Sequence, residues 1–176
     1  LYHPDMKDYV EGNYSADNQL GDEAEARKGE SRLWKYYEGI RKASTFIVNV
    51  DRCPELTMDE IADMKGQARF LRAYCYWALI RVYGPVPLIP LEGLDVNLSY
   101  EELSLPREHF DNLVDFIDQE LAESARSLPT KRTVNNLGRP TRGAALGLRS
   151  RVLLYAASPL FNGNTDFFNV KDLSLI

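Results

Sequence analysis

Residues 57–83 constrain the fold more than any other segment of the chain. They open with Thr57-x-x-Glu60, a capping box in which the Thr57 hydroxyl accepts from the Glu60 N–H and the Glu60 carboxylate accepts from the Thr57 N–H. Two apolar stripes at helical spacing follow, and Gly84-Pro85 ends them. A helix that is apolar on two sides packs on two sides, so this segment predicts a long helix with neighbours on both faces. The first stripe is Ile61, Met64, Ala68, Leu71, Cys75, Ala78 and Val82, and the second is Phe70, Tyr74, Trp77 and Arg81.

This pattern assigns individual side chains to the core or to the surface. It places Leu71 in the core, so Leu71→Ala should cost about 2–5 kcal/mol of stability. It places Asp63 on the solvated face, so Asp63→Ala should cost no more than about 0.5 kcal/mol. Trp34 and Trp77 fall in mid-helix, which favours core packing over a platform for sugar rings.

Three further segments, residues 32–50, 107–127 and 142–157, show the same helical period. Ser31 and Thr141 are the expected N-caps of the first and last, and Pro129 follows the middle one. Prolines at positions 85, 87 and 90 remove three backbone donors, so residues 85–90 should be extended but not a central strand. The first stripe is Leu33, Tyr37, Ile40, Ala43, Ile47 and Val50, the middle one is Phe110, Leu113, Val114, Ile117, Leu121, Ala125 and Leu128, and the last segment is crowded by Gly143, Ala144, Ala145, Gly147, Ala156 and Ala157.

Four helices without an alternating strand pattern predict an all-α fold. The last two begin near residues 107 and 141, which are 34 residues apart, the period of a tetratricopeptide repeat. We therefore expect tetratricopeptide-like stacked helix pairs with irregular connecting loops. The expected organisation is an irregular polar segment over residues 1–30, a helical region over 31–163, and the truncated start of a following segment over 164–176. The chain itself is expected to be a piece of a longer protein.

Composition excludes several classes of function. The chain has 21 Lys and Arg against 26 Asp and Glu, a net charge of −5, which argues against a nucleic-acid-binding protein. Apolar residues make up 44% and charged residues 27%, as in an ordinary globular protein. The apolar runs are far shorter than the roughly 20 residues of a transmembrane helix, so none is expected.

The sequence contains no recognisable constellation of catalytic residues. His3 and His109 are far apart and lack metal-ligand spacing, and no nucleophile elbow or phosphate loop is present. We expect no enzyme, no metal and no cofactor. Cys75 is interpreted as a small buried hydrophobe and Cys53 as a free loop thiol, with a disulfide between them as the alternative.

Charged residues on the helices receive structural interpretations. Arg69, Arg72 and Arg81 interleave with aromatic residues near the buried faces of the segment 57–83. Buried arginines need carboxylates, carbonyls or aromatic planes as partners, which favours clamping between helices over a ligand-facing role. Five aspartates on the polar faces of the helices are interpreted as solvated surface charge. They are Asp59, Asp63, Asp111, Asp115 and Asp118.

Four strings, in the same order along the chain, resemble the SusD/RagB family. Residues 33–43 match W-x-x-Y-x-x-I-x-x-A, residues 67–76 match A-R-F-L-R-A-x-x-Y, and residues 81–89 contain Y-G-x-V-P-L. Residues 138–159 match G-R-x-T-x-G-A-A followed by R-x-x-L-Y-A-A-S-P. Two departures are Gln67, where the family usually has Glu, and Ser44, where Asn is common.

The resemblance implies an all-α, tetratricopeptide-like protein with a non-catalytic function. Members of the family are nutrient-binding lipoproteins on the outward-facing surface of the bacterial outer membrane. They deliver an oligosaccharide to a TonB-dependent, SusC-like transporter. Membrane association would then depend only on a lipid anchor that lies outside this chain. The matching motifs are scaffold residues, so they transfer no binding residues.

Candidate ligand-binding residues therefore come from composition alone. A glycan site needs aromatic faces for the sugar C–H surfaces and short polar side chains for the hydroxyls. Outside the helices, Tyr9, Tyr14, Asp17 and Asn18 fit this description best, with an ordinary polar loop as the alternative. Two functions remain open: a glycan-binding protein that serves a transporter, and a helical protein-interaction scaffold with no small-molecule ligand. A glycosidase is less favoured than either.

Overall fold

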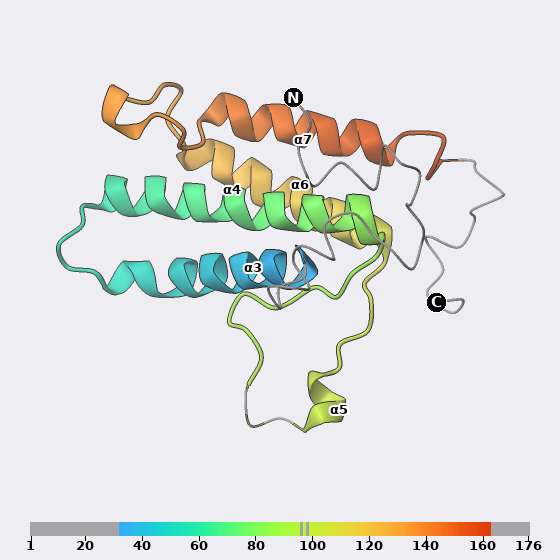
Figure 1. Cartoon of the computed structure of the whole chain (residues 1–176). Coiled ribbons are helices and arrows are strands. Elements are labelled where there is room, and N and C mark those ends of the chain that lie inside the picture. The colour runs from blue at the N-terminus through green and yellow to red at the C-terminus, as the bar shows by residue number, and fades with distance from the viewer. Residues whose placement is uncertain (1–31, 96, 98, 163–176) are drawn as a thin grey trace, which may run out of the picture. The chain divides into compact units, whose positions relative to one another are not determined.

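The computed structural model describes residues 32–95, 97 and 99–162. The chain divides into two compact units, residues 1–38 and 39–176, and every contact discussed below lies within the second unit. The segments 1–30 and 164–176 fall outside the described residues, as does the expected cap at Ser31. Within the described ranges the structure contains helices and no strand, which confirms the all-α prediction (Figure 1).

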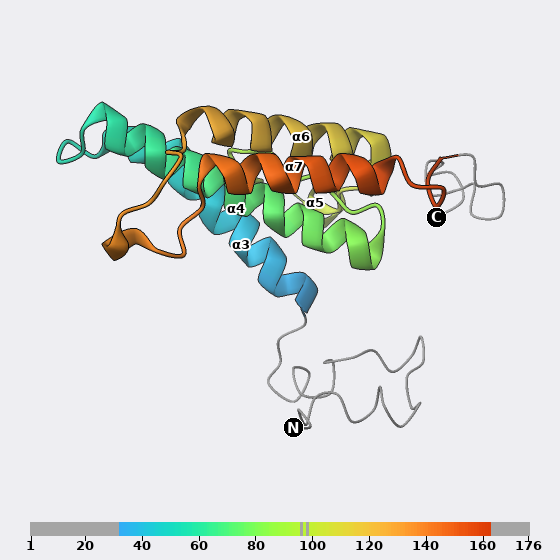
Figure 2. The same ribbon diagram turned by 90° about the horizontal axis from the view of Figure 1, so that it is seen from above.

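Four long helices form the structure: α3 (Arg32–Asn49), α4 (Met58–Tyr83), α6 (Phe110–Ser127) and α7 (Arg142–Ala156). Each starts and ends within about three residues of its predicted bounds. The sequence did not indicate the short helix α5 (Tyr100–Leu103) or the 3-10 turns η2 (Val50–Arg52) and η3 (Val134–Asn136). Figure 2 shows the four long helices from above.

The capping box predicted for α4 is confirmed. The Glu60 N–H donates to Thr57 Oγ1 at 3.3 Å, and the Thr57 N–H donates to Glu60 Oε2 at 2.9 Å. At the other end Gly84 has φ 65°, a left-handed conformation that glycine adopts without a steric penalty. Thr141 likewise caps α7, since its hydroxyl accepts from the Ala144 N–H at 3.3 Å. These local contacts explain why both helices begin where the sequence predicts.

Helix α6 is the shared neighbour of α4 and α7, as Figures 1 and 2 both show. It is strongly amphipathic, and every residue of its predicted stripe is buried. The hydrophobic effect drives this packing, because each Å² of apolar surface removed from water contributes about 25 cal/mol of free energy. The best-buried large side chains are Ile40, Tyr76, Leu79, Ile80, Phe110, Leu113, Ile117, Leu121, Leu128 and Val152.

The contact between α4 and α6 depends on a glycine. A Cβ added at Gly66 would lie 3.1 Å from Ser127 Cβ and 3.3 Å from Leu128 Cδ2, closer than ordinary packing allows. The buried Ser124 hydroxyl donates to the Gly66 carbonyl at 2.8 Å. The two helix backbones therefore approach closely at this point because no side chain separates them.

The proline-rich segment after α4 is extended and is not part of a sheet, as predicted. Two side chains of α4 hold it at Ile89: Arg72 Nη2 donates to the Ile89 carbonyl at 2.9 Å, and the Ile89 N–H donates to Tyr76 Oη at 2.9 Å. Farther along, Arg107 Nη1 donates to the Pro85 carbonyl at 3.0 Å. The connection that carries α5 (Figure 1) is thus held to α4 near its start, and Arg107 joins its far end to that start.

Several of the side-chain assignments made from the sequence are wrong. Leu71 is 51% exposed and Trp34 is 69% exposed, although both were expected in the core. Val82 and Tyr74 are exposed as well, whereas Trp77 is buried as expected. The two stripes of α4 show which side chains are apolar, but only some of them face a helix of this chain.

Candidate functional site

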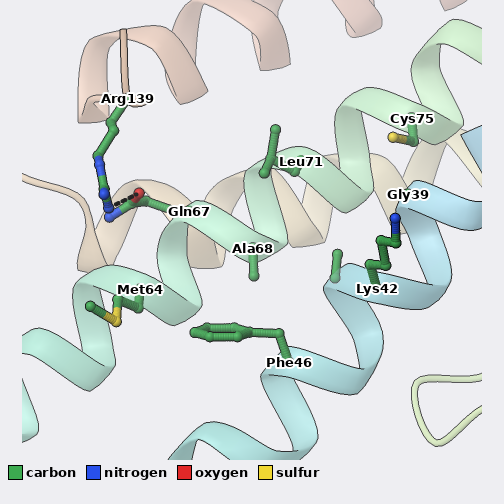
Figure 3. Close-up of a pocket in the computed structure, with 10 residues that line it drawn as sticks. Gly39, Lys42, Phe46, Met64, Gln67, Ala68, Leu71, Cys75 and Arg139 are labelled. Carbon is green, nitrogen blue, oxygen red and sulfur yellow. Dashed lines mark hydrogen bonds between the residues drawn. The ribbon is translucent and has the colours of Figure 1, made fainter. Parts of the chain in front are cut away.

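A groove lies between α3 and α4 (Figure 3). Its volume is about 510 Å³, within the 300–1,000 Å³ typical of binding pockets. Its lining comes from both helices and from the loop that precedes α7. The lining residues are Gly39, Lys42, Ala43 and Phe46 of α3, Met64, Gln67, Ala68, Leu71 and Cys75 of α4, and Arg139.

Small residues explain why the groove exists. A Cβ added at Gly39 would lie 3.1 Å from Cys75 Sγ, so the two helices nearly touch there. Ala43 and Ala68 continue this contact in a cluster with Ile47. These short side chains allow α3 and α4 to approach each other, but they do not fill the space beside the contact, and that space is the groove. Larger side chains, including Phe46 at 40% exposed and Leu71, line the same space.

The polar groups of the groove are few and are mostly cationic. Lys42 and Arg139 both line it, and no lining residue is a carboxylate. Arg139 Nη1 donates to Gln67 Oε1 at 3.2 Å, the contact drawn in Figure 3. Burial raises the pKa of the Cys75 thiol to about 11, so the thiol remains protonated near neutral pH and is a poor nucleophile.

A buried arginine fastens the loop that carries Arg139. The Arg132 side chain is only 7% exposed and binds both carboxylate oxygens of Asp63, at 2.6 and 2.8 Å. Two of its nitrogens also donate to the Pro140 carbonyl, at 2.9 and 2.7 Å. Asp63 is therefore not a solvated surface charge, because it holds the loop 130–140 against α4.

A second arginine cluster lies between α4 and α6. Arg69 Nη1 donates to Glu120 Oε1 at 2.6 Å, and Arg72 Nη1 lies 3.8 Å from the same oxygen. The Arg72 guanidinium also lies over the Phe116 ring, 4.8 Å from its centroid. Burial raises the pKa of Glu120, while the two arginines act in the opposite direction. The structure confirms the predicted clamping role for both arginines, and Arg81 stacks on the Trp77 ring at 5.2 Å.

These clusters do not form an assembled catalytic site in the part of the chain that the structure describes. No group of three or more His, Cys, Asp or Glu side chains there could hold a metal ion.

Both cysteines are free thiols and are partly exposed, so Cys75 is less buried than expected. Of the helix carboxylates expected in solvent, Asp118 instead pairs with Arg149 at 2.6 Å. The sequence did not predict the groove, because no local pattern shows that Gly39 and Ala43 of one helix face Ala68 of another.

The structure does not test the predicted glycan-binding residues. Tyr9, Tyr14, Asp17 and Asn18 all lie outside the described residues. None of the described helices is long and apolar enough to cross a membrane.

Fold and site together define an all-α protein of stacked helix pairs whose described part carries an apolar groove. Residues 6–154 match the sequence pattern of the SusD-like family described as "Starch-binding associating with outer membrane". The chain belongs to this family, and the described residues have the helical, tetratricopeptide-like fold that the resemblance implies. The resemblance based on the four strings is therefore confirmed.

Individual relatives agree with this assignment. The chain is 24% identical over 143 residues to SusD-like protein P25 of Formosa agariphila, covering 80% of this chain and 26% of that protein. A crystal structure of a SusD-like protein from Bacteroides fragilis is 31% identical and has a TM-score of 0.62 over 70% of this chain and 23% of its own. Surface glycan-binding protein A from Bacteroides uniformis is 26% identical, with a TM-score of 0.61 over 70% of this chain and 27% of its own. The chain thus spans about a quarter of the length of each of these relatives.

Proposed function

We propose that this chain acts in a non-catalytic cell-surface protein that binds an oligosaccharide and delivers it to a TonB-dependent, SusC-like transporter in the outer membrane. The family match over residues 6–154 carries the proposal, because the family description names starch binding and the outer membrane. The printed name of the Bacteroides uniformis relative, a surface glycan-binding protein, supports a glycan as the ligand.

The groove between α3 and α4 does not suit this glycan. Its surface is almost entirely apolar, and a sugar hydroxyl buried there without a hydrogen bond would cost about 1–3 kcal/mol. The glycan-contacting residues are therefore expected elsewhere, and Tyr9, Tyr14, Asp17 and Asn18 remain the candidates.

Binding of the native full-length protein to soluble starch and to laminarin, measured by affinity electrophoresis, tests the proposal. We expect retardation by at least one glycan and no release of reducing sugar. Replacing Tyr9 and Tyr14 by Ala should weaken retardation at least tenfold, whereas Tyr74→Ala, at an exposed position on α4, should leave it unchanged. Glycan hydrolysis that a single carboxylate substitution abolishes would show that the protein is an enzyme.

Delivery to a transporter needs its own test. An affinity-tagged copy expressed in the producing bacterium should co-purify with a TonB-dependent transporter and should be cut by protease added to intact cells. A protein that is protected from protease in intact cells would contradict the surface location.

The groove itself favours a second function, protein interaction, because its apolar walls match an apolar protein surface better than a sugar.

A further inference from the structure

The loop 130–140, which joins α6 to α7, carries two apolar side chains into solvent. Val134 is 82% exposed and Leu137 is 73% exposed. The Leu137 N–H donates to the Val134 carbonyl at 3.4 Å in the 3-10 turn η3, and side chains three residues apart in such a turn lie on the same side. Figures 1 and 2 both show this loop extending away from the start of α7. Val134 and Leu137 thus form an exposed apolar tip.

The rest of the loop holds this tip in a fixed position. The Arg142 N–H donates to the Pro129 carbonyl at 2.9 Å and closes the base of the loop. The nearly buried Arg132 binds Asp63 of α4, and Gly138 turns the backbone with φ 89°. Compact surface loops whose ends lie close together are frequently functional. A buried ion pair that holds an apolar tip in solvent indicates a tip that is presented to a partner.

The charge around the tip is positive. Residues 124–165 contain seven Lys or Arg and no Asp or Glu, so all 26 acidic residues lie elsewhere in the chain. Lys131, Arg139 and Arg142 are exposed, and none of the three pairs with a carboxylate within the described residues. Such a local excess of cations in an acidic chain indicates an anionic partner.

The apolar tip and the cations together narrow the identity of that partner. A purely polar polyanion, such as an acidic polysaccharide, would pair with the cations but would leave Val134 and Leu137 in water. An anionic lipid surface accommodates both, because aliphatic side chains enter the boundary between headgroups and acyl chains while Lys and Arg lie near the phosphates. The family description also names association with the outer membrane.

We propose that the loop 130–140 docks on an anionic lipid surface. Val134 and Leu137 insert below the headgroups, and Lys131, Arg139 and Arg142 lie against the lipid phosphates. This contact fixes the orientation of the helices relative to the membrane, so it goes beyond the proposed glycan-binding function. It does not depend on that function, because the predicted glycan residues are a different part of the chain.

A fluorescent amino acid that is sensitive to its environment tests the proposal when it replaces Leu137. The full-length protein, expressed without lipid modification, is mixed with vesicles of equal amounts of phosphatidylcholine and phosphatidylglycerol. The emission should shift to shorter wavelength, and vesicles of phosphatidylcholine alone should bind at least tenfold more weakly. The same group at Gln119, an exposed position on α6, should show no shift. No shift at position 137, or equal shifts at both positions, would overturn the proposal.

The accessibility of the tip and the identity of its partner are tested with the same position. Before vesicles are added, iodide should quench the group at position 137, because the tip is in solvent. Protection from iodide would show that the full-length protein itself covers the tip, and would refute docking on lipid. Benzoylphenylalanine at Leu137 should crosslink to lipid in intact cells, whereas crosslinking to one protein only would assign the tip to a protein partner instead.

Matched charge variants test the role of the cations. Lys131→Gln with Arg139→Gln should weaken binding to the anionic vesicles at least tenfold, as measured by the shift at position 137. Arg41→Gln with Arg151→Gln removes the same charge at exposed positions outside the loop and should change binding less than twofold. Both pairs should melt near the wild-type temperature, since none of the four residues is buried. Equal weakening by the two pairs would show that net charge alone, and not the loop, attracts the vesicles.

Discussion

Asp63 and Leu71, both on α4, show how a side chain's partners decide its importance. Asp63 is the one carboxylate that the structure pairs with the nearly buried Arg132 within the described residues. Leu71 is apolar, but half of its surface remains in solvent in this chain. The expected order of their mutational effects is therefore the reverse of the order that the stripe pattern predicts.

Substitutions at these two positions test that reversal in the 176-residue chain. Asp63→Ala should cost about 1.5–3 kcal/mol, because it leaves the Arg132 guanidinium without its charged partner. Leu71→Ala should cost less than about 1 kcal/mol, and the fully buried Leu79→Ala should cost about 2–5 kcal/mol as a reference. Urea denaturation measures all three. A loss for Leu71→Ala as large as that for Leu79→Ala would mean that Leu71 is covered.

Glu120 should make stability depend on pH. Its folded-state pKa is raised by burial, so the folded chain binds its proton more tightly than the unfolded chain does. The contribution of Glu120 to the free energy of unfolding therefore increases as the pH falls through its folded-state pKa. This contribution is complete below the unfolded-state pKa near 4.5. Wild type should gain stability relative to Glu120→Gln between pH 7 and about 4.5. A difference in unfolding free energy that stays constant, or that falls with acid, would contradict the raised pKa.

The helices differ in how much of their packing can be predicted from their own sequence. The α6 stripe is continuous and one-sided, and all seven of its predicted residues are buried. Helix α4 is apolar on two sides, and its own sequence does not show which apolar side chains face α6. Close approach between two helices also requires a residue without a side chain at the contact. Gly66 is that residue between α4 and α6.

Two glycine substitutions separate close packing from helix propensity. Gly147 on α7 has open space around its Cβ position, so Gly147→Ala should stabilise the chain by up to about 1 kcal/mol. Gly66→Ala should instead destabilise it by about 1–3 kcal/mol, because the new methyl group meets Ser127 and Leu128. Thermal and urea melts of both variants decide this. Similar stabilisation by both would mean that α4 and α6 are farther apart than the structure shows.

At the scale of the whole molecule, apolar surface remains open on α7. One face of this helix packs on α6, while Leu146, Leu153 and Leu154 are exposed. Exposed apolar patches larger than a few hundred Å² favour association. Stacked helix pairs generally bury such faces against a further pair.

The 176-residue chain, made alone, should therefore self-associate in a concentration-dependent way. Leu146→Gln with Leu154→Gln should raise the monomer fraction in size-exclusion chromatography with light scattering. Val134→Gln with Leu137→Gln, which changes two exposed apolar residues on the loop before α7, should have a smaller effect. A wild-type chain that remains monomeric with a sharp cooperative melt would show that the outer face of α7 does not drive association.

The sequence by itself determined the positions of the four long helices, the N-caps of α4 and α7, and the family to which the chain belongs. Capping boxes, prolines and helical periods act over three or four residues, so their effects can be predicted from a short stretch of sequence. The same local strings carried the resemblance to the SusD-like family. The predicted glycan residues rest on composition alone, and they remain predictions.

Only the tertiary structure decided which apolar faces are covered and which charged residues pair. Arg132 and Asp63 are 69 residues apart, and Arg69 and Glu120 are 51 apart, so no local pattern connects them. The groove likewise requires Gly39 and Ala43 of one helix to meet Ala68 of another. Burial depends on the neighbour that folding brings to a surface, and a helical stripe specifies an apolar face without specifying what that face contacts.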